Sequence, residues 1–271
     1  MAQRESDIPT PPGSVVTHET GAIGWITFDN PTRHNAMSRD MWQSLGDAVR
    51  GYAENPAILA VVLKGKGDRA FVAGSDISGF EKERSSHSDI REYDAILAGA
   101  LAALQGCPKP TIAMIRGYCI GGGMAIAATC DIRFAADDAR FAIPAAKRGI
   151  AYRFAGVKQL ADIVGPAFAA EIFFTGGQFS ASDALQMRFV NRIVPVEKLD
   201  SYVLDCAQTL ASNAPLTIAS IKRSLIEYRK DPTDRDLALC EQMADGCFTS
   251  EDYREGQLAF KERRSAVFKG R

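Results

Sequence analysis

Short apolar runs alternate with amphipathic helical patterns along the first part of the chain. Apolar residues fill 15–18 and 22–28 on either side of Thr20-Gly21, which predicts a hairpin at the start. Residues 59–63 and 111–115 are further short apolar runs of the kind that form buried strands. Helical spacing of apolar residues follows Ser38, a residue suited to capping a helix, and returns around 90–104. Strands that alternate with helices predict an α/β fold with crossover connections over a mixed or parallel sheet.

From residue 196 onward the pattern is helical. Apolar residues recur every three or four positions in 202–210, 218–225 and 237–243, and a last helix is expected after Ser250. Pro215 and Pro232 separate these helices, because proline is not tolerated in a helix interior.

We therefore divide the chain into a flexible N-terminal tail (1–13), a core (14–195) and a C-terminal helical region (196–271). The polar stretch 81–89 lacks a sustained apolar face and predicts a flexible loop beside a pocket. Glu81 and His87 in this stretch either reach a ligand or face solvent.

Composition excludes several classes of protein. The 271 residues carry a net charge of −1, from 32 basic and 33 acidic side chains, so there is no overall basic excess to bind nucleic acid or an anionic membrane. No apolar run reaches the length of a transmembrane helix, and the first residues lack the apolar segment of a secretory signal. We expect a cytoplasmic protein.

The six cysteines are scattered without a CxxC pair, and the chain has only three histidines. No metal-ligand spacing results, so no metal site is expected. We predict reduced thiols that pack as small apolar residues. Cys119 lies nearest to the glycine run described next, but a buried structural role is favoured over a nucleophilic one, because no histidine lies close in sequence.

Two glycine-bearing stretches, 70–77 and 117–125, each read as a strand that runs into a turn and opens a helix. Such turns can present free backbone N–H groups. Paired N–H groups at helix starts stabilise an oxygen that becomes negative during acyl or enolate chemistry. Glycine before a helix is also an ordinary turn, so either stretch alone is weak support.

Together, the two stretches resemble the crotonase (enoyl-CoA hydratase/isomerase) superfamily, and the likeness covers nearly the whole chain. It continues through 29–37, 131–135, 173–176 and 255–260. The resemblance implies a spiral of repeated ββα units with a C-terminal helical trimerisation region. It also implies an oxyanion hole that accepts the thioester carbonyl of an acyl-CoA and stabilises its enolate, formed by the N–H groups of Ser75 and Gly122.

The same resemblance places the residues next to the hole, Ala73, Asp76 and Ile77, among those that bind the substrate. Hydratases of the superfamily carry two glutamates that handle a water, and this chain has Ala125 and Ala145 at those positions. General acid–base catalysis contributes about 10²–10⁴ in rate for each group, so hydration without either carboxylate is doubtful.

Tyr152 and Arg153 distinguish this chain from ordinary hydratases. Their segment is locally similar to the methylmalonyl-CoA decarboxylase branch, whose tyrosine at the matching position lies in the acyl pocket. The match is partial, since that branch keeps the first glutamate and has a histidine where this chain has Ser75. Decarboxylation needs no base, and Tyr152 or a water could supply the late proton. Simple core packing is the alternative for Tyr152.

Arg153 stands where some isomerases of the family carry an acidic base. Arginine stays charged at any ordinary pH and cannot abstract a proton. It could instead hold an acidic acyl group through a forked hydrogen bond, or it could be a solvated charge at the start of a surface helix.

Residues that would hold CoA also follow from the resemblance. Arg33 matches a basic residue near the nucleotide, and Phe260 and Arg263 match an aromatic and basic pair that relatives contribute to a neighbouring subunit's CoA. The alternative for this pair is a solvated end of an amphipathic helix. The resemblance implies no cofactor apart from the CoA of the substrate, and self-association as a trimer or hexamer.

Three hypotheses follow. The first is a CoA-thioester lyase that stabilises an enolate and catalyses decarboxylation or another step that needs no base. The second is a catalytically silent acyl-CoA binder, which the lost carboxylates favour and the retained oxyanion turns oppose. The third is a structural paralogue, which would have no obvious reason to retain Gly74 and the run 121–123.

Overall fold

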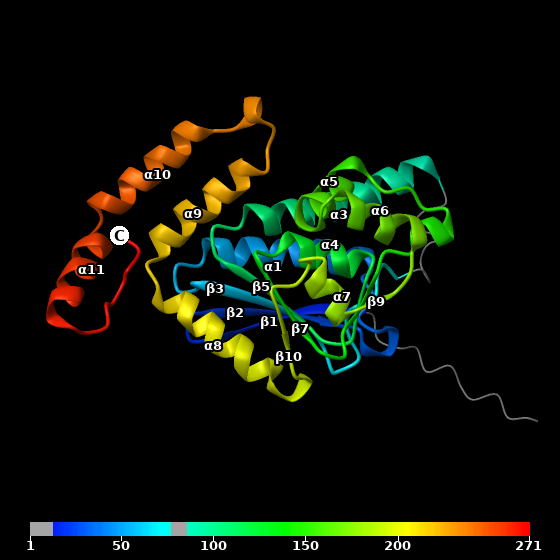
Figure 1. The fold of residues 1–271 in the computed structure, drawn as a ribbon, viewed down its shortest axis with the longest axis horizontal. Coiled ribbons are helices and arrows are strands. Elements are labelled where there is room, and N and C mark those ends of the chain that lie inside the picture. Colours follow the sequence, from blue (N-terminus) through cyan, green and yellow to red (C-terminus); the bar gives the residue numbers. More distant parts are fainter. Residues whose placement is uncertain (1–12, 77–85) are drawn as a thin grey trace, which may run out of the picture.

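The computed structural model of the chain describes residues 13–76 and 86–271. Its larger sheet has six strands in the order β1-β2-β3-β5-β7-β10 (Figure 1). These strands are β1 (Ser14–Thr20), β2 (Ile23–Asp29), β3 (Ala60–Gly65), β5 (Thr111–Ile115), β7 (Ile132–Ala136) and β10 (Arg192–Val194). The β1–β2 pair is antiparallel, as the predicted hairpin requires, and the other pairs of this sheet are parallel.

A smaller sheet of four strands has the order β4-β6-β8-β9. Its strands are β4 (Ala70–Val72), β6 (Tyr118–Ile120), β8 (Arg140–Ala142) and β9 (Phe179–Ser180). The chain visits both sheets in turn, since β3 is followed by β4, β5 by β6 and β7 by β8. The first two of these strand pairs are each followed by a helix, which gives the expected ββα repeat and confirms the predicted α/β class.

The helices cover both faces of the larger sheet, as Figure 1 shows. Those of the core are α1 (Arg39–Glu54), α3 (His87–Gly106), α4 (Gly122–Thr129), α5 (Phe154–Val164), α6 (Pro166–Thr175) and α7 (Ala181–Gln186). On the opposite face, α8 (Leu199–Ser212) buries Leu199, Val203 and Ala207 against the sheet. Because both faces are covered, the central strand β5 is buried along its whole length.

Several local predictions are confirmed, and one is wrong. Ser38 caps α1 by accepting a hydrogen bond from the Met41 N–H at 3.2 Å. The loop expected over 81–89 is wrong for its last residues, because Ser86 and Asp89 form a capping box that starts α3 at His87. Residues 77–85 lie outside the described part of the chain, and Glu81 lies among them.

The C-terminal helices confirm the helical pattern predicted from residue 196 onward. They are α9 (Pro215–Tyr228), α10 (Leu237–Thr249) and α11 (Glu251–Glu262). We call residues 237–271 the C-terminal arm, and Figure 1 shows its helices extending away from the sheets.

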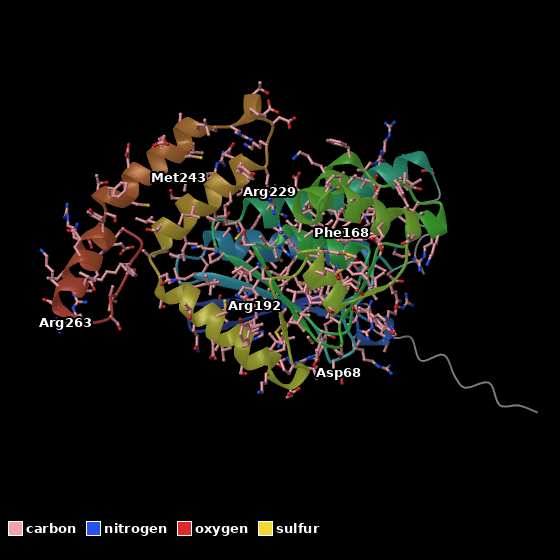
Figure 2. The ribbon with its side chains drawn as sticks, viewed as in Figure 1. Asp68, Phe168, Arg192, Arg229, Met243 and Arg263 are labelled. Carbon is pink, nitrogen blue, oxygen red and sulfur yellow. The ribbon has the colours of Figure 1, made fainter. Side chains whose placement is uncertain are left out.

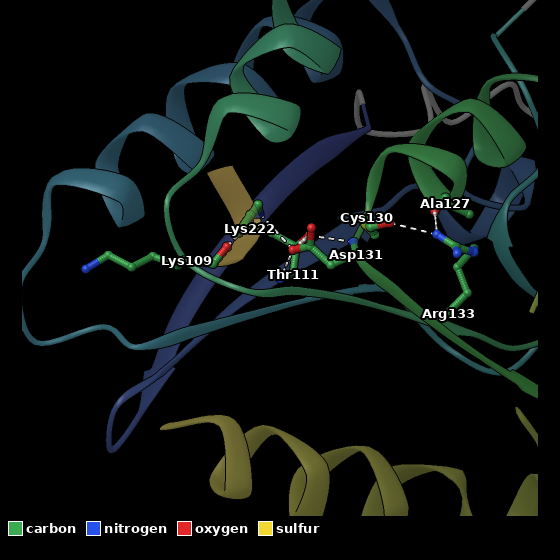
Figure 3. A network of polar contacts seen from close by, with 7 residues as sticks. All are labelled: Lys109, Thr111, Ala127, Cys130, Asp131, Arg133 and Lys222. Carbon is green, nitrogen blue, oxygen red and sulfur yellow. Dashed lines mark hydrogen bonds and ion pairs between the residues drawn. The ribbon is translucent and has the colours of Figure 1, made fainter. Parts of the chain in front are cut away.

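An ion pair between the buried Lys222 and the more exposed Asp131 fastens α9 to the core (Figure 3). The Lys222 ammonium donates to Asp131 Oδ2 at 2.7 Å and to the Lys109 carbonyl at 2.8 Å. The same carboxylate oxygen accepts from the Thr111 N–H and hydroxyl at 2.7 and 2.8 Å. Asp131 Oδ2 thus joins Lys222 of α9 to Thr111 of β5, which fixes the junction between α9 and the core.

Candidate active site

The two glycine turns foreseen in the sequence lie against each other. They follow β4 and β6, which are parallel neighbours, so both turns leave the same edge of the smaller sheet. Gly74 has φ +105° and Gly121 φ +52°, conformations that favour glycine. A Cβ atom on Gly121 would lie only 3.9 Å from the Gly74 Cα, so no side chain separates the turns.

Two backbone N–H groups lie at this junction. Gly122 is the first residue of α4, where N–H groups have no intrahelical acceptor. Ser75 is held from both sides, because Met37 donates to the Gly74 carbonyl at 2.8 Å and accepts from the Asp76 N–H at 2.9 Å. Within residues 13–76 and 86–271, the Ser75 N–H has no backbone acceptor. Ser75 and Gly122 line one cavity.

This cavity has a volume of about 570 Å³ and lies between α3, α4 and α5. Most of its walls are apolar, formed by side chains such as Leu97, Leu101, Met124 and Leu160. A concave, mostly apolar site with a few polar groups is typical of small-molecule binding. The predicted residues that line it are Ala73, Ser75, Gly122, Ala125, Ala145, Tyr152 and Arg153.

Ala125 and Ala145 line the cavity together, so the two positions lie in one site, as expected from the sequence. Their methyl groups cannot bind a water or transfer a proton. The cavity wall at these two positions is therefore apolar.

Tyr152 points its ring at Phe173 of α6, with 4.8 Å between the ring centroids and 60° between the planes. The side chain is half-buried in the cavity wall. Burial raises the pKa of its phenol to about 12, so the hydroxyl is protonated at neutral pH. A phenol in this state can donate a proton or a hydrogen bond.

Arg153 lies directly before α5, and its guanidinium binds the carboxylate of Asp94 on α3. Nε and Nη2 donate to Asp94 Oδ2 at 3.0 and 2.6 Å, and both residues line the cavity. The Arg153 side chain is 73% exposed, so the pair lies where the cavity meets solvent. The sequence reasoning missed Asp94, although Leu97, Leu101 and Gln105 follow it at helical spacing and line the same cavity.

Arg33 and Asp76 come together beside Ser75. Arg33 Nη1 donates to both carboxylate oxygens of Asp76, at 2.8 and 2.6 Å. The predicted substrate contact at Ile77 lies outside the described residues.

Phe260 and Arg263 lie in the C-terminal arm, and Phe260 is 86% exposed. Figure 2 shows Arg263 at the tip of the arm, far from the core. Neither residue lines the cavity of its own chain. The expected contact with a neighbouring subunit's CoA remains a prediction.

The structure also bears on Cys119, the thiol nearest to the glycine run. Cys119 is buried in β6, and this burial raises the pKa of its thiol well above the usual value, which makes it a poor nucleophile. The described residues contain no group of three or more His, Cys, Asp or Glu side chains arranged to hold a metal ion. Nor does any helix in that part of the chain have the length and apolar character needed to cross a membrane.

Comparisons with known proteins agree with this fold. The sequence profile of the enoyl-CoA hydratase/isomerase family matches residues 18–271, and the chain belongs to this family, within the crotonase superfamily. A short-chain-enoyl-CoA hydratase of Clostridium acetobutylicum is 32% identical over 93% of this chain and 95% of its own. Carnitinyl-CoA dehydratase of Escherichia coli is 32% identical over 93% of this chain and 96% of its own.

Among solved structures, an enoyl-CoA hydratase/carnithine racemase from Magnetospirillum magneticum superposes with a TM-score of 0.89. It is 33% identical, and the match covers 95% of this chain and 96% of that one.

Proposed function

We propose that this protein binds an acyl-CoA and stabilises the enolate of its thioester with the N–H groups of Ser75 and Gly122. One observation carries the proposal. The two glycine turns touch at the edge of the smaller sheet, and both residues line the same apolar cavity. Fixed N–H donors need no reorganisation as the negative charge develops, and removing one such donor typically costs about 10²–10³ in rate. The relatives named for enoyl-CoA and carnitinyl-CoA chemistry support the same substrate class.

For the reaction, we propose decarboxylation of a malonyl-type thioester. The bond between the α-carbon and the carboxylate breaks, CO₂ leaves, and the electron pair forms the enolate held by Ser75 and Gly122. A proton then moves from the Tyr152 phenol, or from water, to the α-carbon. The missing carboxylates at Ala125 and Ala145 do not hinder this step, because it needs no base.

The Asp94–Arg153 pair favours a second candidate, proton transfer at the α-carbon of an enoyl thioester. Asp94 brings a carboxylate to the cavity wall, and a positioned carboxylate can act as general base. Arg153 would then orient this carboxylate rather than bind the substrate. A single base suffices to move a proton within the substrate.

Assays with malonyl-CoA, methylmalonyl-CoA and an enoyl-CoA separate these reactions. Decarboxylation predicts CO₂ release that Asp94→Asn leaves largely intact. Proton transfer predicts double-bond migration in a 3-enoyl-CoA that Asp94→Asn reduces by about 10²–10⁴-fold. Brisk hydration of crotonyl-CoA by the unmodified protein would contradict both, because some other residue would then have to position the water.

Arg153→Ala tests how the acyl group is held. If Arg153 binds a malonyl carboxylate, the substitution weakens malonyl-CoA binding much more than butyryl-CoA binding in calorimetric titrations. Equal losses of affinity for the two ligands would mean that Arg153 contacts the CoA moiety or only supports the fold. If the protein binds acyl-CoA and turns over none of these substrates, its function is that of a catalytically silent acyl-CoA binder.

A further inference from the structure

The cavity that contains Ser75 and Gly122 extends along α4 to the last residue of that helix, Thr129. Thr129 lies seven residues beyond Gly122. At 1.5 Å per residue, this separation is about 10 Å along the helix axis. Leu97 and Leu101 of α3 add apolar wall to the same cavity. An extended acyl chain whose carbonyl lies at Gly122 would therefore run toward Thr129.

The far end of the cavity is polar. Gln159 Nε2 donates to the Thr129 hydroxyl at 2.9 Å. The Lys158 ammonium donates to Asp162 Oδ2 at 2.9 Å and to the Arg229 carbonyl at 2.8 Å. All five of these residues line the cavity. A purely aliphatic acyl chain would end against groups that prefer a polar partner.

Arg229 differs from the other charged residues at this end. It is half-buried, and within residues 13–76 and 86–271 its guanidinium makes no hydrogen bond or ion pair. Figure 2 shows Arg229 at the end of α9 that lies against the core. Its backbone is held by Lys158, and α9 itself is anchored through Lys222. The guanidinium is thus held at the cavity without the anionic partner that a partly desolvated cation favours.

The surrounding charges are also predominantly positive. Lys158 and Arg229 line this end of the cavity, and Asp162 is the only carboxylate of the described residues that lines it with them. Behind them, the buried Arg133 donates to the carbonyls of Cys130 and Ala127 (Figure 3), and to no carboxylate in the part of the chain that the structure describes. Burial, and further the charge of Arg229, lower the pKa of Arg133. An anion at this end would reduce this positive excess.

We propose that Arg229, with Lys158 beside it, forms an anion subsite that receives a carboxylate at the far end of the acyl chain. The ligands of this class are CoA thioesters of medium-chain dicarboxylic acids, and their terminal carboxylate is a different group from the α-carboxylate that decarboxylation would remove. The proposal rests on the proposed function, because the chain length is counted from a thioester carbonyl held at Ser75 and Gly122. With C–C bonds of about 1.5 Å, an extended chain advances roughly 1.3 Å per carbon, so about eight carbons span the cavity.

Calorimetric titration of the full-length protein with octanedioyl-CoA and octanoyl-CoA tests the subsite, because the two ligands differ only at the terminal carbon. We expect octanedioyl-CoA to bind about tenfold or more tightly, the effect of a hydrogen bond to a charged group. Arg229→Ala should remove this preference without weakening octanoyl-CoA binding, whereas Arg229→Lys should keep part of the preference. Arg192→Ala removes an exposed arginine outside the cavity and should preserve the preference. Butanedioyl-CoA is too short to reach Arg229 and should gain nothing from it.

The remaining outcomes each overturn the inference in a recognisable way. Equal affinity for octanedioyl-CoA and octanoyl-CoA would show that no anion subsite exists, while leaving the proposed acyl-CoA function intact. If Arg229→Ala lowers the affinity for both ligands equally, Arg229 contacts the CoA moiety or only supports the fold. If no acyl-CoA binds at all, the proposed function fails together with the subsite.

Discussion

Among single residues, Gly122 contributes a backbone N–H on which the proposed chemistry depends. Replacing Gly122 by proline removes that donor, and the first position of a helix tolerates proline. We expect turnover of the best acyl-CoA substrate to fall by about 10²–10³-fold. Steady-state kinetics measure the loss, and a thermal melt checks that the protein remains folded.

Gly122→Ala is the matched control for that experiment. A Cβ atom at position 122 would lie 3.0 Å from Trp42 Cζ2, so both variants crowd the same ring. Only the proline variant lacks the N–H. Alanine should therefore retain most of the activity. If alanine costs as much as proline, crowding of Trp42 explains the loss, and Gly122 has no role as a donor.

Tyr152 provides a second test at this scale, through its dependence on pH. Burial raises its pKa from 10.0 to about 12, so the folded state keeps the phenol protonated after the unfolded state has lost its proton. The contribution of this group to the free energy of unfolding is full below pH 10 and is lost as the pH rises toward 12.

Chemical unfolding at several alkaline pH values should therefore show that the free energy of unfolding falls less steeply with pH for Tyr152→Phe than for the unmodified protein. The same substitution should lower kcat with little change in binding if Tyr152 donates the proton. An unchanged slope would mean that burial does not hold this phenol neutral.

At the scale of elements, the position of α4 against β4 depends on Gly123. A Cβ atom there would lie 2.2 Å from the Val72 carbonyl oxygen, a distance that forces the helix start away from the strand. We expect Gly123→Ala to lower the free energy of unfolding by about 1–3 kcal/mol. Because Gly122 moves with the helix, activity should fall as well. Denaturant unfolding and kinetics on the same sample measure both effects.

Gly99 of α3 offers the control for this helix substitution. A Cβ atom at Gly99 would meet nothing within 4 Å, so alanine there brings only its better helix propensity. Gly99→Ala should stabilise the protein by about 0.5–1 kcal/mol. If Gly123→Ala and Gly99→Ala change the free energy of unfolding by the same amount, the close approach of α4 to β4 is contradicted.

Elements were more predictable from the sequence than the contacts between them. The apolar run 111–115 predicted β5 with its observed bounds, because a buried strand has a continuous apolar pattern. The Asp94–Arg153 pair joins residues 59 positions apart, and no local pattern states that α3 and the start of α5 meet. Arg229 was missed for the same reason, since its position depends on how α9 docks through Lys222 and Asp131. The two glycine turns that bring Ser75 and Gly122 to one cavity could be predicted, because glycine between a strand and a helix marks a local turn. The pairing of these two residues as an oxyanion hole came from the family resemblance and stays a prediction.

At the scale of the whole molecule, the C-terminal helices expose an unusual amount of apolar surface. The exposed side chains there are Ile221, Leu225, Tyr228, Leu237, Phe248, Tyr253, Leu258 and Phe260. Large exposed apolar patches mark protein interaction sites. Self-association through this surface would cover these side chains, and the trimer or hexamer implied by the family resemblance stays a prediction.

A closed ring would also bring Phe260 and Arg263 of one subunit to the cavity of its neighbour, and mixed oligomers test that arrangement. Gly122→Pro inactivates the core, while Phe260→Ala with Arg263→Ala inactivates only the arm. Co-expression with two different tags and purification on both gives oligomers that contain both kinds of subunit. In these, some sites combine an intact core from one subunit with an intact arm from the next, and roughly a third of the sites are restored in a mixed trimer.

Activity of the mixed oligomers should therefore exceed that of either variant alone, although each chain carries a defect. The gain depends on the site being shared, since defects confined to separate sites cannot compensate for each other. Mixed oligomers no more active than the variants would show that each subunit completes its own site, and the arm would then serve association alone. If the two tags never co-purify and sedimentation shows a monomer, the exposed face of the arm has another partner, and Phe260 and Arg263 have no part in binding CoA.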